Sequence, residues 1–156
     1  MQTITRKFLV KQVPNLTGKK RWVQNRFYLY RKNGVVIRVQ SSGDIFELER
    51  KVNKTTLIRE SEKITITKDE FEALSKTSSD SINRDNYLIS ETPHVALRIY
   101  HMRFEGLVRA EVEFQSVEEA NLFSPLEWMG EEITNTALAT DETLLDLTAQ
   151  DFQVLL

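Results

Sequence analysis

The chain reads Leu107-Val108-Arg109-Ala110-Glu111-Val112-Glu113-Phe114 about two thirds of the way along its 156 residues. Apolar and charged side chains alternate through this stretch. Alternation is typical of a β-strand, because successive side chains of a strand point to opposite faces of the sheet. Arg109, Glu111 and Glu113 therefore share one face, opposite an apolar face. The stretch predicts a strand that lies between an apolar layer and a charged one.

Similar stretches, rich in β-branched and aromatic residues, predict further short strands, with Asn33-Gly34 and Ser42-Gly43-Asp44 as turns. The predicted strands span residues 3–10, 23–31, 35–40, 45–52, 57–66, 94–100 and 107–115, and residues 87–90 could add an eighth. One interpretation is an ordinary antiparallel sheet with a solvated charged face, which periodicity alone favours roughly two to one. The other is a barrel with a polar lumen and an apolar exterior covered by helices.

Helix signals interrupt and follow the predicted strands. Thr67-Lys68-Asp69-Glu70 and Ser116-Val117-Glu118-Glu119 have the capping-box pattern of a helix start. The polar run 75–84 between them is typical of an exposed loop. From Thr140 onward, apolar residues near helical spacing predict one amphipathic helix, with two acidic residues at its N-terminus. The residues behind this last prediction are Asp141, Glu142, Leu144, Leu147, Phe152 and Leu155.

Composition excludes several classes of protein. The net charge is only −2, so no global field indicates nucleic acid or an anionic membrane. The average hides a division, because residues 1–78 carry +9 and residues 79–156 carry −11. The absence of cysteine excludes disulfides and thiol catalysis, and no apolar run is long enough for a membrane helix or a signal peptide. We expect one cytoplasmic domain over residues 1–156, with a core over 3–134 and a C-terminal helix over 135–156.

A family resemblance appears at both ends of the predicted core. Residues 3–10, Thr-Ile-Thr-Arg-Lys-Phe-Leu-Val, resemble the opening of the CYTH superfamily, the triphosphate tunnel metalloenzymes, whose ExExK motif often continues as Phe-Leu-Val. Residues 107–114, the predicted helix over 116–123, and Pro125 to Thr134 resemble the closing segment of the same family, with Glu-Val-Glu, Trp and Gly-Glu-Glu in the same order and at similar spacing. The closing segment is the more specific match.

The resemblance implies an α+β, mainly β protein: an eight-stranded antiparallel barrel, or tunnel, with a few helices outside. Family members bind a polyphosphate through basic lumen residues and Mg²⁺ or Mn²⁺ through acidic ones. They act as inorganic, thiamine or RNA triphosphatases, or as class IV adenylyl cyclases. The family positions that bind the phosphorylated ligand correspond here to Lys7, Arg38, Lys51, Arg59, Arg84 and Arg98.

The acidic positions of the family are less well matched. Thr3 and Thr5 stand where the motif has glutamates, and Gln40 stands at the second arginine of its RxR strand. The acidic pair of the strand that Arg59 opens falls on Ser61 and Lys63, unless a slip of one residue brings Glu60 and Glu62 inward. Where the family often has a Glu and an Asp, this chain has Ala96 and Arg98. Glu111 and Glu113 remain as the candidate ligands of Mg²⁺ or Mn²⁺, and most other acids of the second half are expected outside the tunnel.

Four interpretations follow. The leading hypothesis is a divergent tunnel domain that binds a phosphorylated small molecule, such as a triphosphate or nucleotide, with catalysis weak or lost. The second is a metal-dependent hydrolase of inorganic or organic triphosphates. The third is a nucleic-acid or protein-binding module that uses Lys19-Lys20-Arg21-Trp22 with Arg26, Phe27 and Tyr28, although such clusters are usually solvated loops. In the last, the lumen charges form a structural network without a ligand.

The predicted C-terminal helix has its own alternatives. Its apolar residues, Leu144, Leu145, Leu147 and Phe152, could cover the barrel wall, cap a tunnel mouth or pair two copies of the chain as a homodimer. We expect core packing. The sequence offers no further signal for a membrane partner.

Overall fold

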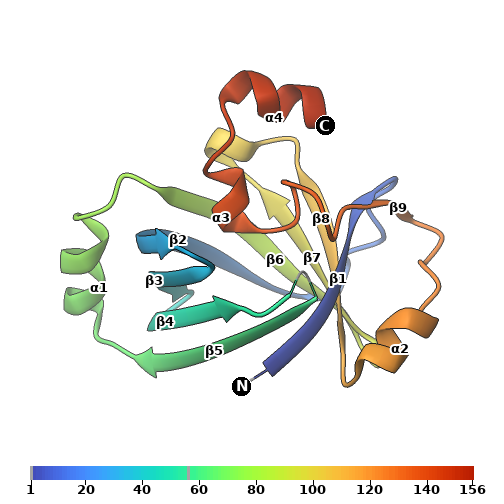
Figure 1. Ribbon diagram of the computed structural model, residues 1–156, viewed down its shortest axis with the longest axis horizontal. Coiled ribbons are helices and arrows are strands. Elements are labelled where there is room, and N and C mark those ends of the chain that lie inside the picture. The colour runs from blue at the N-terminus through green and yellow to red at the C-terminus, as the bar shows by residue number, and fades with distance from the viewer. Residues whose placement is uncertain (1, 56) are drawn as a thin grey trace.

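The computed structural model describes residues 2–55 and 57–156, and its central feature is a closed antiparallel barrel (Figure 1). Eight strands form the barrel within the described residues: β1 (Gln2–Val10), β2 (Lys20–Lys32), β3 (Val35–Ser42), β4 (Ile45–Asn53), β5 (Ile58–Thr65), β6 (Ser81–Glu91), β7 (His94–Tyr100) and β8 (Val108–Phe114). The strand order is β5-β4-β3-β2-β6-β7-β8-β1, and β1 pairs with β5 to close the ring. The barrel expected from the family resemblance is confirmed, and the open sheet is not what forms.

Turn chemistry sets the register of the first hairpins. Asn33 and Gly34 both have positive φ, of 53° and 76°, as a two-residue turn with the twist of a β-hairpin requires. This turn joins β2 to β3 and pairs Lys32 with Val35. In the next two strand pairs, Arg38 lies opposite Glu49 and Lys51 lies opposite Ser61. This register places Ser61 and Lys63 on the lumen face, so Glu60 and Glu62 lie on the outer face.

Two helices cover the apolar exterior of the barrel. Helix α1 (Lys68–Ser75) begins with the expected capping box, in which Thr67 Oγ1 accepts from Glu70 N–H at 3.1 Å and Glu70 Oε1 accepts from Thr67 N–H at 2.8 Å. Its Phe71 packs on Phe27 and Phe46, with ring centroids 5.8 and 5.2 Å away. Helix α2 (Val117–Leu122), capped by Ser116, lies beside β1 and β8 on another part of the wall.

A second apolar cluster lies beneath α2. Phe8, Val95, Ala110, Val112 and Met129 are its buried members. Met129 belongs to β9 (Met129–Glu132), a short strand that pairs with β1 and that the sequence analysis did not predict. Local elements therefore cover part of the apolar outer wall, and the inward faces in the middle of the barrel carry polar side chains.

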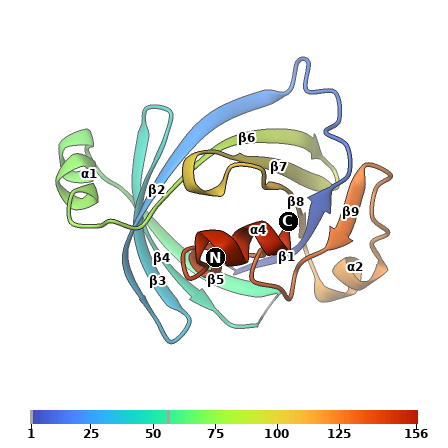
Figure 2. The ribbon, with the colours of Figure 1, turned by 90° about the horizontal axis from the view of Figure 1, so that it is seen from above.

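The C-terminal segment closes one mouth of the barrel rather than forming a single helix. It divides into α3 (Asp141–Leu144) and α4 (Ala149–Leu155), which lie over the barrel interior in Figure 2. Leu144, Leu145 and Phe152 are buried in one cluster with barrel residues. The barrel members of that cluster are Tyr28, Val36, Ile82, Tyr100 and Leu107, together with Phe104 of the short 3-10 helix η1 (Met102–Phe104). The expected core packing of the tail is thus observed, in the form of a cap.

Two expectations about local structure are wrong. The polar run 75–84 is not a loop throughout, because β6 begins at Ser81 and buries Ile82 and Arg84. The single tail helix is also wrong, because residues 145–148 separate α3 from α4. At the start of β6, Arg84 faces the barrel interior, and local polarity cannot distinguish that environment from solvent.

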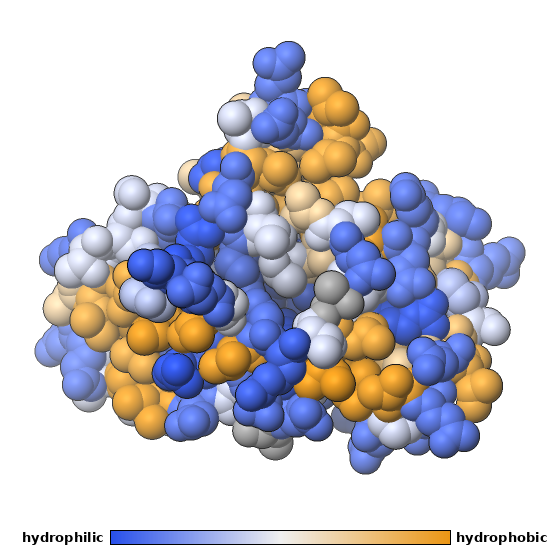
Figure 3. Space-filling view, in the orientation of Figure 1, coloured by the Kyte–Doolittle hydropathy of each residue, from blue (hydrophilic) through white to orange (hydrophobic). Residues whose placement is uncertain are grey.

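The molecular surface carries hydrophobic side chains on the projecting α4 (Figure 3). Val154, Leu155 and Leu156 are among its exposed apolar residues. Pairing of two copies through the tail stays a prediction. Within the described residues, no helix is long and apolar enough to cross a membrane.

Candidate anion-binding tunnel

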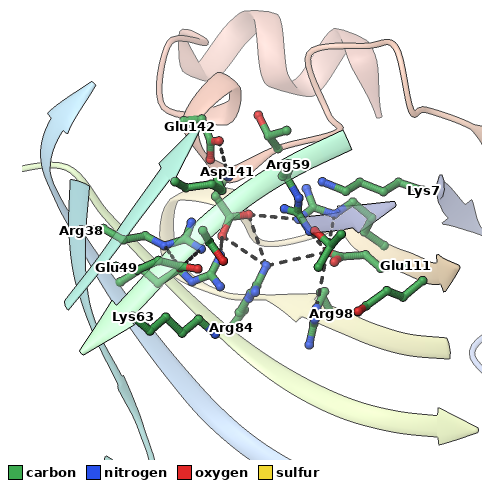
Figure 4. Close-up of a pocket in the computed structure, with 17 residues that line it drawn as sticks. Lys7, Arg38, Glu49, Arg59, Lys63, Arg84, Arg98, Glu111, Asp141 and Glu142 are labelled. Atoms are coloured by element: carbon green, nitrogen blue, oxygen red, sulfur yellow. Dashed lines mark hydrogen bonds and ion pairs between the residues drawn. The ribbon is translucent and has the colours of Figure 1, made fainter. Parts of the chain in front are cut away.

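A cavity of about 490 Å³ lies inside the barrel, and charged side chains dominate its lining. Among the described residues, nine that line the cavity are cationic and five are acidic, which gives a formal charge of +4. Figure 4 shows side chains of both signs converging on the middle of the barrel. The cationic residues are Lys7, Arg26, Arg38, Lys51, Arg59, Lys63, Arg84, Arg98 and Arg109, and the acidic ones are Glu49, Glu111, Glu113, Asp141 and Glu142.

The structure brings all eight predicted site residues together in this cavity. They come from seven different strands, because each occupies an inward position of the β-alternation. The predicted ligand-binding residues Lys7, Arg38, Lys51, Arg59, Arg84 and Arg98 and the predicted metal ligands Glu111 and Glu113 all line it. Their shared location is observed, and their roles stay predictions.

Sequence reasoning missed several lining residues. Arg109 shares the inward face with Glu111 and Glu113, so the alternation itself contained the signal for it. Arg26 and Glu49 likewise lie on inward faces of β2 and β4. Asp141 and Glu142 had no such signal, because acids at a helix N-terminus usually face solvent. The expectation that the acids of the tail lie outside the tunnel is wrong for these two.

Asp141 is fully enclosed by hydrogen-bond donors. Its Oδ1 accepts from Arg109 Nη2 at 3.1 Å and from the Tyr100 hydroxyl. Its Oδ2 lies 3.0 Å from Arg26 Nη1 and 3.2 Å from Arg84 Nη1. Burial alone would raise the pKa of this carboxyl, but the guanidinium groups of Arg84, Arg109 and Arg26 outweigh burial and hold the pKa well below its usual range. Asp141 is therefore an ionised carboxylate inside the barrel.

Glu142 forms an ion pair with Lys51 and accepts a hydrogen bond from Asn53 Nδ2 at 3.4 Å. Its second oxygen, Oε2, is buried without a hydrogen-bond donor in the described part of the chain. Burial is the largest influence on Lys51 and lowers its pKa to about 7, although Glu142 acts in the opposite direction. Nearby Arg38 and Arg59 lower the pKa of Lys51 further. At Lys51, burial thus outweighs the ion pair with Glu142.

Arg38 and Glu49 form a second buried pair across β3 and β4. Arg38 Nε donates to Glu49 Oε1 at 2.9 Å, and Arg38 Nη1 donates to the Tyr28 hydroxyl at 3.0 Å. Burial opposes ionisation of Glu49, but Arg38 and then Arg26 lower its pKa to about 2. Burial and the positive charges of Arg38 and Arg84 lower the pKa of Arg26 to about 10.

The carboxylate of Glu111, one of the two predicted metal ligands, binds arginine side chains. Its Oε2 accepts from Arg109 Nε at 3.2 Å and Nη2 at 3.0 Å, and Arg98 Nε and Arg84 Nη1 lie 3.4 and 3.9 Å from the same oxygen. Glu113 is half-exposed, with His94 Nδ1 at 3.9 Å. Among residues 2–55 and 57–156, no group of three His, Cys, Asp or Glu residues could hold a metal ion. The donor set therefore does not fit a resident divalent cation, because positive charge surrounds the one buried carboxylate of the predicted pair.

Three lining cations have no carboxylate partner in the described part of the chain. The side chain of Arg59 makes no hydrogen bond or ion pair with the described residues, and its Nε is buried without an acceptor. Lys7 Nζ donates to the Ala139 carbonyl at 2.6 Å, and burial, followed by the charge of Arg59, lowers its pKa well below the usual range. Lys63, at the more exposed end of the lining, forms no ion pair with the described residues. An anion in the cavity would give Arg59 and Lys63 a charged partner and would add one to Lys7 beside its bond to the Ala139 carbonyl.

Comparison with known proteins supports this architecture. No protein-family model and no curated protein matches the chain. Among solved structures, the inorganic triphosphatase NE1496 is similar with a TM-score of 0.72 and 23% identity, covering 94% of this chain and 95% of that one. HpAC1 from Hippeastrum, described as having a dominant triphosphatase activity, is similar with a TM-score of 0.52 and 12% identity, covering 76% and 82%. PH1012 of Pyrococcus horikoshii OT3 is similar with a TM-score of 0.58 and 13% identity, covering 76% and 83%.

The chain has the triphosphate tunnel fold. The resemblance expected from residues 3–10 and 107–134 is confirmed at the level of the fold. A tunnel fold also explains why charged residues alternate with apolar ones on nearly every strand, since the lumen takes the place that a hydrophobic core has in a smaller barrel.

The residues proposed to bind nucleic acid do not form one surface. Arg26 lines the cavity and Tyr28 is buried, so neither is available on the outer wall. Phe27 packs against Phe71 of α1. Lys20 lies over the ring of Trp22, with its Nζ 5.8 Å from the ring centroid. The basic and aromatic residues of β2 therefore divide between lumen and exterior and form no continuous binding strip.

Proposed function

We propose that this protein binds a phosphorylated small molecule, such as a polyphosphate or nucleotide, inside the tunnel, and hydrolyses it slowly or not at all. The observation that carries the proposal is Arg59, a lumen guanidinium with a buried Nε and no acceptor among the described residues. Leaving a buried cationic donor unsatisfied is costly, so such groups are usually paired or bind an anion. The net positive lining supports the same conclusion.

Phosphoryl oxygens suit this lining better than a carboxylate ligand does. A guanidinium presents several N–H donors in one plane and forms paired hydrogen bonds with phosphate. Lys7 and Lys63 add point charges on either side of the ligand in the proposal. A phosphorylated anion would raise the pKa of Lys7 and of Lys51, which burial lowers, because a nearby negative charge favours the charged form.

Weak catalysis in this proposal follows from the poor fit of the lining to a metal ion. Hydrolysis of a triphosphate by an enzyme of this kind needs charge stabilisation at the transferred group and a positioned water. Glu111 is engaged by arginines and Thr3 carries a neutral hydroxyl in the lining. No reaction step is therefore assigned to a metal here, and Glu111 and Glu113 as ligands of Mg²⁺ or Mn²⁺ stay a prediction.

Calorimetric titration tests the proposal. Tripolyphosphate and ATP are titrated separately into the protein with Mg²⁺ and with EDTA, in a buffer free of phosphate. We expect saturable binding of tripolyphosphate in EDTA that is at least as tight as in Mg²⁺, because the cations of the lining act on the anion directly. Absence of binding in both conditions contradicts the proposal.

A second candidate function is a metal-dependent triphosphatase. The similarity to NE1496, an inorganic triphosphatase aligned over 94% of this chain, favours it. Release of phosphate from tripolyphosphate that requires Mg²⁺ or Mn²⁺, and that is lost in EDTA and in Glu111→Gln, would support this candidate. No release above the buffer rate with either metal would exclude it.

A further inference from the structure

The surroundings of Asp141 resemble those of a bound phosphoryl group. Three guanidinium groups and a phenol hydroxyl converge on this one carboxylate, from β2, β6, β7 and β8. Asp141 itself comes from α3, which lies outside the ring of strands. Arginines of the barrel thus bind the carboxylate of Asp141, which belongs to a different element of the same chain.

The segment that carries Asp141 makes further contacts of the same kind. Arg109 Nη1 donates to the Leu138 carbonyl at 2.9 Å, and Lys7 Nζ donates to the Ala139 carbonyl at 2.6 Å. Glu142 adds its ion pair with Lys51. Residues 138–142 therefore present carbonyl and carboxylate oxygens to four cations from β2, β6, β8 and β4 and to Lys7 of β1.

Apolar packing holds this segment in the mouth of the barrel. Thr140 caps α3 by accepting from Thr143 N–H at 3.2 Å. Leu144, which is fully buried, and Leu145 follow the two acids directly and lie in the apolar cluster of the cap. The carboxylates are therefore fixed in place by a neighbouring part of the fold and do not depend on their ion pairs alone.

The segment lowers the positive charge of the tunnel lining. The formal charge is +4 with Asp141 and Glu142, and would be +6 without their carboxylates. With both carboxylates in place, the lining cations without a carboxylate partner among the described residues are Lys7, Arg59 and Lys63. A ligand finds unpaired cations over only part of the tunnel.

We propose that residues 138–142 act as a built-in anion, and that Asp141 and Glu142 thereby determine which ligands the tunnel accepts. This inference rests on the proposed function. A short phosphorylated anion of one or two phosphoryl groups binds at Lys7, Arg59 and Lys63, and a third phosphoryl group gains little because the remaining arginines are already paired. Asp141 and Glu142 are thus specificity-determining residues against long polyphosphates.

The test compares pyrophosphate with tripolyphosphate by calorimetry in EDTA. For the wild-type protein we expect dissociation constants within about threefold of each other, since the additional charge meets no free cation. For Asp141→Asn combined with Glu142→Gln, which keeps the shapes of both side chains, we expect tripolyphosphate to bind at least about tenfold more tightly than pyrophosphate. Asp146→Asn is the matched control, because Asp146 follows Glu142 by four residues and its side chain, 68% exposed, pairs with Arg31 outside the tunnel lining. It should behave as the wild type.

Two results would overturn the inference. One is a wild-type preference for tripolyphosphate above about tenfold, and the other is an unchanged preference in the double variant. If the double variant does not fold, Glu142→Gln alone, which leaves the Asp141 ion pairs in place, must still increase the preference for tripolyphosphate. Binding by the double variant but not by the wild type would contradict the proposed function of the native chain and support the built-in anion. Binding by neither contradicts both.

Discussion

At the scale of single residues, Arg59 differs from the other arginines of the lining. Arg26, Arg38, Arg84, Arg98 and Arg109 each lie within 3.4 Å of a carboxylate oxygen, whereas Arg59 has no such partner among the described residues. A paired arginine contributes to the structure whether or not a ligand is present. An unpaired one in a buried position has its main favourable interaction still to make. For this reason, a substitution of Arg59 should change the affinity for the anion more than it changes the stability of the fold.

Replacing Arg59 tests this separation. We expect Arg59→Met to weaken binding of pyrophosphate by at least about tenfold, because hydrogen bonds to charged groups contribute about 1.5–3 kcal/mol each. The stability of the variant should be unchanged or higher, since removal of Arg59 relieves its repulsion of Lys7 and Lys51. Calorimetry and urea unfolding measure the two effects.

Arg50→Met is the matched control for Arg59→Met. Arg50 lies on the exposed outer face of β4, away from the lumen. The Arg50→Met substitution should leave the dissociation constant of pyrophosphate unchanged. Equal affinities for wild type and Arg59→Met would show that Arg59 does not contact the anion.

The lowered pKa of Lys51 predicts that binding of the anion depends on pH. Its pKa of about 7 means that about half of the unliganded protein carries this charge at neutral pH. A bound anion favours the protonated lysine and raises that pKa, so binding takes up a proton. Below pH 7 the lysine is already charged, and its contribution to affinity is constant. As the pH rises through 7, affinity should fall, by up to about tenfold per pH unit.

Calorimetry in two buffers of different ionisation enthalpy measures the proton uptake. We expect the observed binding enthalpies at pH 7.5 to differ between Tris and HEPES, and the difference to become smaller in Lys51→Met. Identical enthalpies in both buffers, together with a constant affinity from pH 6.5 to 8.5, would rule out a titrating lysine at the site.

At the scale of elements, the C-terminal segment joins the apolar cap to the charged lumen. Phe152 of α4 is 2% exposed, and its ring meets that of Phe104 edge to face at 5.3 Å between centroids. Leu144 of α3 lies in the same cluster. The cap therefore determines where Asp141 and Glu142 lie. A loss of apolar contact in α4 would displace α3 and, with it, these two carboxylates in the lumen.

Truncation of Phe152 tests how much the cap stabilises the fold. Phe152→Ala should lower the free energy of unfolding by about 3–5 kcal/mol, the usual cost of removing a buried phenylalanine side chain. Urea unfolding followed by circular dichroism gives the value. Val154→Ala on the same helix is the control, since Val154 is 79% exposed and its truncation should change stability by less than about 0.5 kcal/mol. A similar small change in Phe152→Ala would mean that α4 is not part of the cooperative fold.

The elements differ in how well local sequence predicts them. The capping-box sequences at Thr67 and Ser116 were sufficient to predict α1 and α2, because their signal lies within four consecutive residues. Thr67 forms both hydrogen bonds of the box, and Ser116 forms the one from Glu119 N–H. The start of β6 was not predictable in the same way, since its polar residues are buried by strands distant in sequence. The break between α3 and α4 likewise depends on how the tail fits the barrel mouth. Long-range packing decides these cases.

At the scale of the whole molecule, the division of charge along the chain acquires a physical meaning. The first half carries +9 and the second half −11, and the tunnel draws side chains from both. Alternation in the strands predicted that Lys7, Arg38, Arg98, Glu111 and Glu113 share charged faces, whereas Lys51, Arg59 and Arg84 were carried over from the family resemblance. The acids of α3 could not be placed, because their burial depends on an element that folds back over the mouth. The net charge of −2 consequently says little about the ligand, and the lining charge of +4 says more.

The most direct test of the account is a crystal structure of the protein grown with pyrophosphate in EDTA. The account predicts electron density for the anion inside the barrel, with phosphoryl oxygens within hydrogen-bond distance of Arg59 and Lys7 and with the carboxylate of Asp141 still on its arginines. A tunnel without the anion at saturating pyrophosphate, or an anion bound only on the outer wall, would contradict the central claim that the lumen is an anion-binding site.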